Sequence, residues 1–115
     1  MSQQAISILA LTIAATGAVT ANRFVTPAGV QAGADANAIG VSRVTAAIGE
    51  QMTVDVQGTA IVEAGAAITK GVTLKADASG RGIAWVTSGA KVAIALEAAT
   101  AAGQFIEVLL MDNPA

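Results

Sequence analysis

The 115-residue sequence contains no cysteine, no histidine and no tyrosine. Without cysteine there is no disulfide, and without histidine there is no Ser-His or Cys-His nucleophile pair and no histidine-containing metal site. Two carboxylates alone can hydrolyse glycosides, but the eight acidic residues are scattered and no pair stands out. We therefore expect a protein that is not an enzyme and has no catalytic, cofactor-binding or metal-binding residues.

Charged residues are also scarce, at 12% of the chain against a usual value of about 25%. The six basic residues form no run, and the three aromatic residues, Phe24, Trp85 and Phe105, are far apart in the sequence. Both observations argue against a nucleic-acid partner, which needs basic patches or stacking platforms. Hydrophobic residues make up 54%, so we expect part of the outer surface to be apolar and to bind another protein.

The longest apolar segment, residues 5–21, has the features of neither a signal peptide nor a membrane span. It is interrupted by serine, threonine and glycine, and no Lys or Arg precedes it. Its unbroken apolar part is shorter than the ~20 residues that a spanning helix needs. We interpret it as a β-strand and expect no membrane partner.

Twelve glycines fall at intervals of about ten residues, and short runs rich in Val, Ile and Thr lie between them. This spacing predicts many short strands joined by tight turns, and hence an all-β fold in one domain, residues 1–115. In residues 52–56 the apolar side chains alternate with Thr53 and Asp55, which we place on the solvent face. Residues 105–111 are apolar on both faces, which predicts a second cover, such as another subunit.

Residues 93–102 have a composition that favours helix, but an internal match favours strand. Residues 39–47 and 94–102 match at an offset of 55, and the glycine and the strand-like run that follow each segment match at an offset of 54. A weaker match pairs residues 20–25 with 69–74. We therefore predict a compact small barrel built from two pseudo-repeated halves.

Four short motifs have both a chemical and a structural interpretation. Ser88-Gly89-Ala90-Lys91 fits a serine–lysine nucleophile pattern, but Gly89 and the missing companion motifs favour a polar turn. Asp35-Ala36-Asn37 has alternating oxygen ligands, but it lacks the rest of a calcium loop and predicts a turn. Gly80-Arg81-Gly82 predicts the turn of a hairpin between Leu74 and Trp85. Trp85 itself is either a core residue, which we favour, or an interface hot spot.

A series of short sequence motifs in fixed order covers nearly the whole chain. They are Val19–Val25, Ala38–Ser42, Val56–Ile68, Leu74–Arg81 and Ala95–Val108. Together they resemble the capsid cement, or head decoration, proteins of tailed bacteriophages. The resemblance implies a β-barrel-like or β-tulip-like domain with no catalytic residues to transfer, and it identifies no capsid-contacting residues.

The resemblance further implies a structural virion protein on the outer surface of the capsid, made in the cytoplasm of the bacterial host. Its partners would be the major capsid protein and itself, as a homotrimer at three-fold and quasi-three-fold positions. It would clamp neighbouring capsid subunits and stabilise the DNA-filled head. Residues 1–15 would form an N-terminal extended arm or edge strand that docks on a neighbour, unless they are a core strand of the same domain.

Two alternatives remain open at this point. The chain is alternatively another structural virion component, such as part of a tail tube or baseplate. The second alternative is a small lipoyl-like carrier module, a kind of domain that presents a lysine at a hairpin tip. Lys70, just before Gly71, is the candidate lysine.

Overall fold

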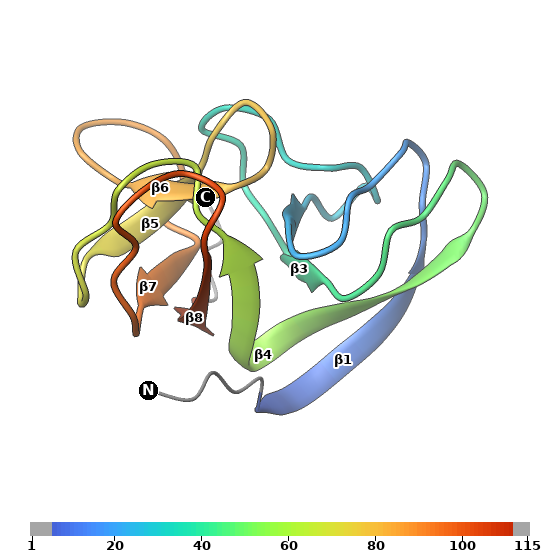
Figure 1. The fold of residues 1–115 in the computed structure, drawn as a ribbon. Helices are drawn as coiled ribbons and strands as arrows, with labels where there is room; N and C mark the ends of the chain where they lie inside the picture. Colours follow the sequence, from blue (N-terminus) through green and yellow to red (C-terminus); the bar gives the residue numbers. More distant parts are fainter. Residues whose placement is uncertain (1–5, 112–115) are drawn as a thin grey trace.

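The computed structural model describes residues 6–111, and within this range the chain is all-β and contains no helix, so none that could span a membrane (Figure 1). The strands are β1 (Ser7–Ala14), β2 (Phe24–Val25), β3 (Gly40–Ser42), β4 (Gln51–Glu63), β5 (Thr73–Ala76), β6 (Gly82–Ala84), β7 (Ala93–Ala95) and β8 (Phe105–Leu110). The glycine spacing thus correctly predicted an all-β fold of short strands. Residues 93–102 form β7 and a turn, as the internal match indicated, and not a helix.

The long strand β4 organises the molecule because its two halves belong to two different groups of strands (Figure 1). Its first half pairs with β1 and β3, and its second half pairs with β8 in the order β4-β8-β7-β5-β6. The change of partners occurs at Gly58, whose φ is +97°. At the far end, the Gly65 amide donates to the Gly82 carbonyl at 2.8 Å, so β6 returns to the end of β4 and nearly closes a barrel.

The two halves are a structural repeat in which β4 is both the last strand of the first repeat and the first strand of the second. In the first repeat, Ala10 to Ala14 of β1 pair in order with Asp55 to Gln51 of β4. In the second, Thr59 to Glu63 of β4 pair in order with Leu109 to Phe105 of β8. The strand pair β2–β3 corresponds in the same way to β5–β7. This confirms the prediction of two pseudo-repeated halves.

The turns of the two repeats carry the same backbone hydrogen bonds. Val19 and Ala46 exchange two bonds of 2.9 Å, and Ile68 and Ala99 exchange two of 2.8 and 2.9 Å. Ala46 therefore corresponds to Ala99, at an offset of 53. The predicted offset of 55, which matched Thr45–Ala47 with Thr100–Ala102, is wrong by two positions. The offset of 54 predicted after the turn is confirmed, since Gln51 of β4 corresponds to Phe105 of β8. Both turns are rich in Ala and Thr, so side-chain identity alone did not fix the alignment there.

Each repeat has its own apolar cluster, and several residues of the first repeat, Phe24 and Val41 among them, belong to the cluster of the second. The first cluster includes Val25, Met52 and Val54, while the second is centred on Val62, Leu74 and other residues of β4 to β8. Phe24 belongs to β2 in the first repeat but is fully buried in the second cluster. Burying a Phe side chain contributes roughly 1.5–3 kcal/mol, so this residue couples the folding of the two repeats.

Two predicted burial assignments are wrong. Asp55, expected on the solvent face of its strand, is only 2% exposed, because the Arg43 guanidinium covers it and bonds both carboxylate oxygens through Nε at 2.9 and 3.0 Å. This contact raises the pKa of Arg43. Trp85, favoured as a core residue, is only partly buried and lies in neither apolar cluster.

Candidate interaction surface

The structure places Ser88 and Lys91 in different local contacts. The Ser88 hydroxyl donates to Asp35 Oδ2 at 3.1 Å, while the Lys91 ammonium lies 4.5 Å from the centre of the Trp85 ring. The cation near Ser88 is Lys75, which bonds the Ser88 carbonyl at 3.2 Å and the Asp35 carboxylate at 2.7 Å. These groups fasten the loop around Asp35 to the β5–β6 region.

Asp35 is held as a carboxylate by this cluster. Its hydrogen bond from Lys75 lowers the pKa of Asp35 below its usual value, against a smaller opposing effect of desolvation. Its backbone is left-handed, with φ of +62°, which Asp tolerates better than most residues in a turn. Asn37 lines a hollow described below, and residues 6–111 contain no cluster of three or more acidic, His or Cys side chains that could hold a metal ion.

The other three sequence candidates lie in loops or turns. Trp85 donates its indole N–H to the Gly89 carbonyl at 2.9 Å, so this ring closes the 85–91 loop. Lys70 is exposed in the turn before Gly71, whose φ is +94°. Gly80 has φ of +78° in the predicted hairpin between β5 and β6.

A network of charged side chains joins the two repeats. Arg23 of the first repeat bonds Glu63 at 3.1 Å, and Arg81 lies 3.6 Å from the other oxygen of Glu63 and 3.3 Å from Asp77. Arg23 and Gln31 also donate to the Ser79 carbonyl at 3.2 and 2.8 Å. These groups are mostly buried, so the network serves cohesion between the repeats.

The prominent feature of the described surface is apolar and belongs mainly to β1 and the residue before it. Ile6, Ile8, Leu9 and Leu11 are 57, 75, 42 and 38% exposed. On β8, Phe105 and Leu109 are 47 and 41% exposed, on the face that the sequence predicted to need a second cover. Large apolar side chains concentrated on one strand are typical of a surface that binds another protein.

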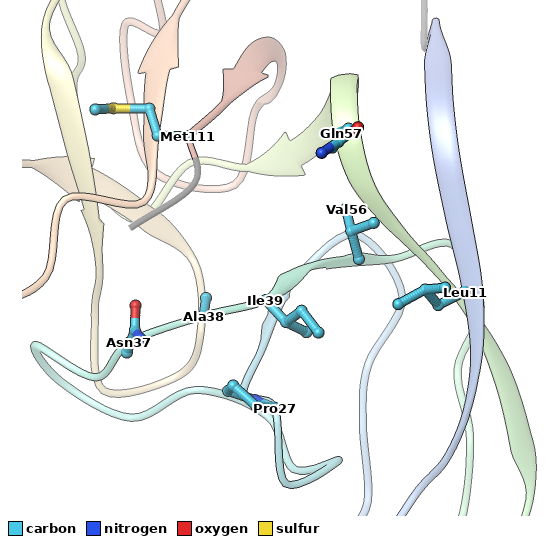
Figure 2. A pocket seen from close by; sticks show the side chains of 8 residues that line it. All are labelled: Leu11, Pro27, Asn37, Ala38, Ile39, Val56, Gln57 and Met111. Carbon is cyan, nitrogen blue, oxygen red and sulfur yellow. The ribbon is translucent and has the colours of Figure 1, made fainter. Parts of the chain in front are cut away.

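A hollow of about 270 Å³ lies between β1 and the loop around residues 27–39 (Figure 2). Leu11 and Val56 project into it from β1 and β4, and Pro27 and Ile39 line the opposite side (Figure 2). Asn37 Oδ1 has no hydrogen-bond partner among the described residues. The hollow is open and mostly apolar, so it offers a seat for an apolar side chain of a partner.

Strand β1 lies at an edge of the sheet. Its register shifts twice between Ser7 and Ala10 and is regular from Ala10 to Ala14. Among the described residues it pairs with β4 alone. The rest of the proposed arm, residues 1–5, lies outside the described residues. Sequence reasoning identified this strand by its apolar, uncharged composition, but it did not predict the hollow, since its wall comes from five separate segments of the chain.

Comparisons with known proteins give two matches. The sequence model of the phage cement protein family matches residues 2–110. Among solved structures, the fold is similar to the N-terminal base of the head fibre protein gp8.5 of bacteriophage phi29, with a TM-score of 0.71 and 19% sequence identity. That match covers 90% of this chain and 93% of the phi29 chain. A search of curated proteins finds no match.

Proposed function

This chain belongs to the phage cement protein family, and from that premise we propose that it binds the outer surface of a phage capsid and clamps neighbouring major capsid subunits together. In this role it stabilises the DNA-filled head and acts without catalysis. We propose that it works as a homotrimer at three-fold and quasi-three-fold positions, after synthesis in the cytoplasm of the bacterial host.

The observation that carries this proposal is the apolar side-chain display of the edge strand β1. The strand contains no charged residue, and Ile8 is 75% exposed. An uncharged, apolar edge strand is a liability for an isolated protein unless it is covered. A capsid subunit supplies such a cover, and main-chain pairing with a strand edge tolerates a wide range of sequences.

A cement protein needs several modest contacts used at once. Once one contact with the shell has formed, the others act at high effective concentration, so individually weak patches give firm attachment. The Ile8 side chain, the apolar hollow and the outer face of β8 are three separate candidates for such patches. Because the protein would bind only the assembled shell, it would stabilise that state by mass action.

Binding to heads that lack the protein tests the proposal. Ile8→Thr keeps a β-branched residue on the strand but removes exposed apolar surface. We expect it to weaken binding by about tenfold or more, because a buried Ile side chain contributes roughly 1.5–3 kcal/mol. Ile48→Thr is the matched control, since Ile48 is 74% exposed in the turn before β4, at the opposite end of β1 from Ile8.

The binding is measured by co-sedimentation of labelled protein with purified heads, and head stability by the temperature of DNA release. Wild-type protein and Ile48→Thr should bind equally and raise the release temperature. Absence of wild-type binding to heads, or localisation in the tail, would overturn the capsid proposal in favour of another virion component.

A further inference from the structure

The chain itself covers the outer edge of the first strand of its second repeat. In the second repeat that strand is the second half of β4, and its edge is bonded by residues from the first repeat. The Thr59 amide donates to the Ile6 carbonyl at 2.9 Å, and the Glu63 amide donates to the Asn22 carbonyl at 2.9 Å. The Asn22 side-chain amide donates to the Ile61 carbonyl at 3.1 Å. An internal turn therefore caps this edge.

The corresponding edge in the first repeat is that of β1. By the shared register, Ala10, Thr12 and Ala14 correspond to Thr59, Ile61 and Glu63. All three are exposed, whereas their counterparts in β4 are partly buried. The bulged part of β1 ends at Ala10, so the stretch that corresponds to the capped edge keeps a regular ladder. The backbone groups of this stretch are therefore available for main-chain hydrogen bonds with another chain.

The capping turn also has a counterpart. Asn22 corresponds to Gly71: both have left-handed backbones, with φ of +65° and +94°. The Asn22 amide donates to Ser42 in the first repeat, and the Gly71 amide donates to Ala95, the residue equivalent to Ser42, in the second. The turn at residues 69–71 is exposed. Within residues 6–111, each chain thus has an uncapped edge in its first repeat and an exposed turn of the capping type in its second.

We propose that the turn at residues 69–71 of a second copy binds the edge of β1 at Ala10 to Ala14, as the Asn22 turn binds β4 within the chain. The side chains agree with this pairing. Within the chain, Arg23 and Glu63 face each other as an ion pair. At the corresponding positions stand Val72 and Ala14, so an apolar pair takes the place of the ion pair.

This contact joins two different surfaces, head to tail. Repeated around an axis, such a heterologous contact closes into a ring or extends into a fibre. The inference rests on the self-association included in the proposed function, and it names the surfaces that carry it.

Three single substitutions test the inference by self-association in solution, measured by sedimentation velocity over a concentration series. Ala14→Glu places a carboxylate opposite Val72 of the next copy, so we expect association to weaken by about tenfold or more. Gly71→Asn introduces, at the corresponding position, the side-chain amide that Asn22 supplies within the chain. It should tighten association several-fold through one added hydrogen bond. An added Cβ at Gly71 meets open space, and Asn tolerates this backbone.

Gly103→Asn is the matched control. Gly103 has φ of +92° and equally open surroundings, but it lies in a turn outside the proposed contact. We expect no change in association for this variant. Circular dichroism and melting temperature, measured on each variant, separate a weaker contact from a damaged fold.

The inference is overturned if the wild-type chain stays monomeric at its highest soluble concentration. It is also overturned if folded Ala14→Glu associates normally, or if Gly71→Asn and Gly103→Asn tighten association equally. Capsid binding is measured separately, on purified heads. Normal head binding by a monomeric chain would refute this contact and leave the capsid role intact, whereas failure to bind heads by a self-associating chain would do the reverse.

Discussion

The two repeats share one backbone plan but differ in what covers them. Residues 10–14 of β1 and 59–63 of β4 pair with their partner strands in the same register. Yet Ala60 and Val62 are fully buried, while Leu11 and Ile13 at the same positions are exposed or partly exposed. The hydrogen-bond frame therefore does not decide burial. Burial depends on what packs against the strand, and among the described residues β1 has a neighbouring strand on one side only.

The same contrast appears in the charges. The contact between the repeats is held by Arg23, Glu63, Arg81 and Asp77, whereas β1 has no charged residue. The inner contact is formed once, during folding, and its ion pairs are largely shielded from water. The uncharged outer edge presents no charge that a partner would have to desolvate.

The largest effect should come from Phe24→Ala, which removes a fully buried side chain of the first repeat from the second apolar cluster. Truncating a buried Phe typically costs about 3–5 kcal/mol of unfolding free energy. We expect both repeats to be destabilised together in one transition of the urea unfolding curve, followed by circular dichroism and Trp85 fluorescence.

The control is Phe105→Ala, because Phe105 is 47% exposed whereas Phe24 is fully buried. It should cost much less. Separate transitions for the two probes in the wild-type chain would show that the repeats fold independently. Equal losses in the two variants would show that burial of Phe24 in the second cluster adds no stability.

The next effect should come from Gly58→Ala, at the point where β4 passes from one repeat to the other. Its left-handed backbone costs a non-glycine residue about 1–2 kcal/mol. In addition, a Cβ there would collide with the Ile6 carbonyl. Gly49→Ala, with φ of +88° and open surroundings, carries only the backbone cost. Equal unfolding free energies for the two variants would show that the close approach of Ile6 to β4 adds no cost to the substitution.

A smaller loss is expected for Glu63→Gln, which leaves Arg23 and Arg81 close together without their shared carboxylate. We expect roughly 1–3 kcal/mol, the usual cost of leaving a mostly buried polar group without its partner. Chemical denaturation measures the loss, and wild-type stability in this variant would show that the network contributes nothing to cohesion.

The smallest effect concerns pH. The pKa of Asp35 is lowered from its usual 3.8 by Lys75, so its contribution to stability is present above that value and lost as pH falls below it. Asp35→Asn should therefore remove a small part of the acid sensitivity of the melting temperature. An identical pH profile in the variant would show that the ion pair does not contribute.

The sequence predicted the β class and the repeat because glycine spacing and strand alternation are local signals. It misplaced the repeat offset by two positions at the turn, since Thr45–Ala47 resembles Thr100–Ala102 more than it resembles the true counterpart around Ala99. The offset of 54 after the turn was correct. It placed Asp55 in solvent because alternation does not reveal that Arg43 covers it. The hollow depends on the approach of residues 11, 39 and 56, which no local pattern encodes.

The apolar N-terminal strand was recognised from its composition alone, yet composition did not separate an arm from a core strand. In the structure residues 7–14 form an edge strand on the chain's own β4, with its outer face exposed. That outcome depends on the bend at Gly58, which leaves the first half of β4 free to pair with β1 and the second half with β8.

Cryo-electron microscopy of the intact phage particle tests the central claim most directly, by asking what lies on the outer edge of β1. The account predicts density for this chain on the outside of the head, with Ile8 against a capsid subunit and the edge at Ala10 to Ala14 capped by residues 69–71 of another copy. A chain absent from the head, or one whose β1 faces solvent along both its edge and its apolar face, would contradict it.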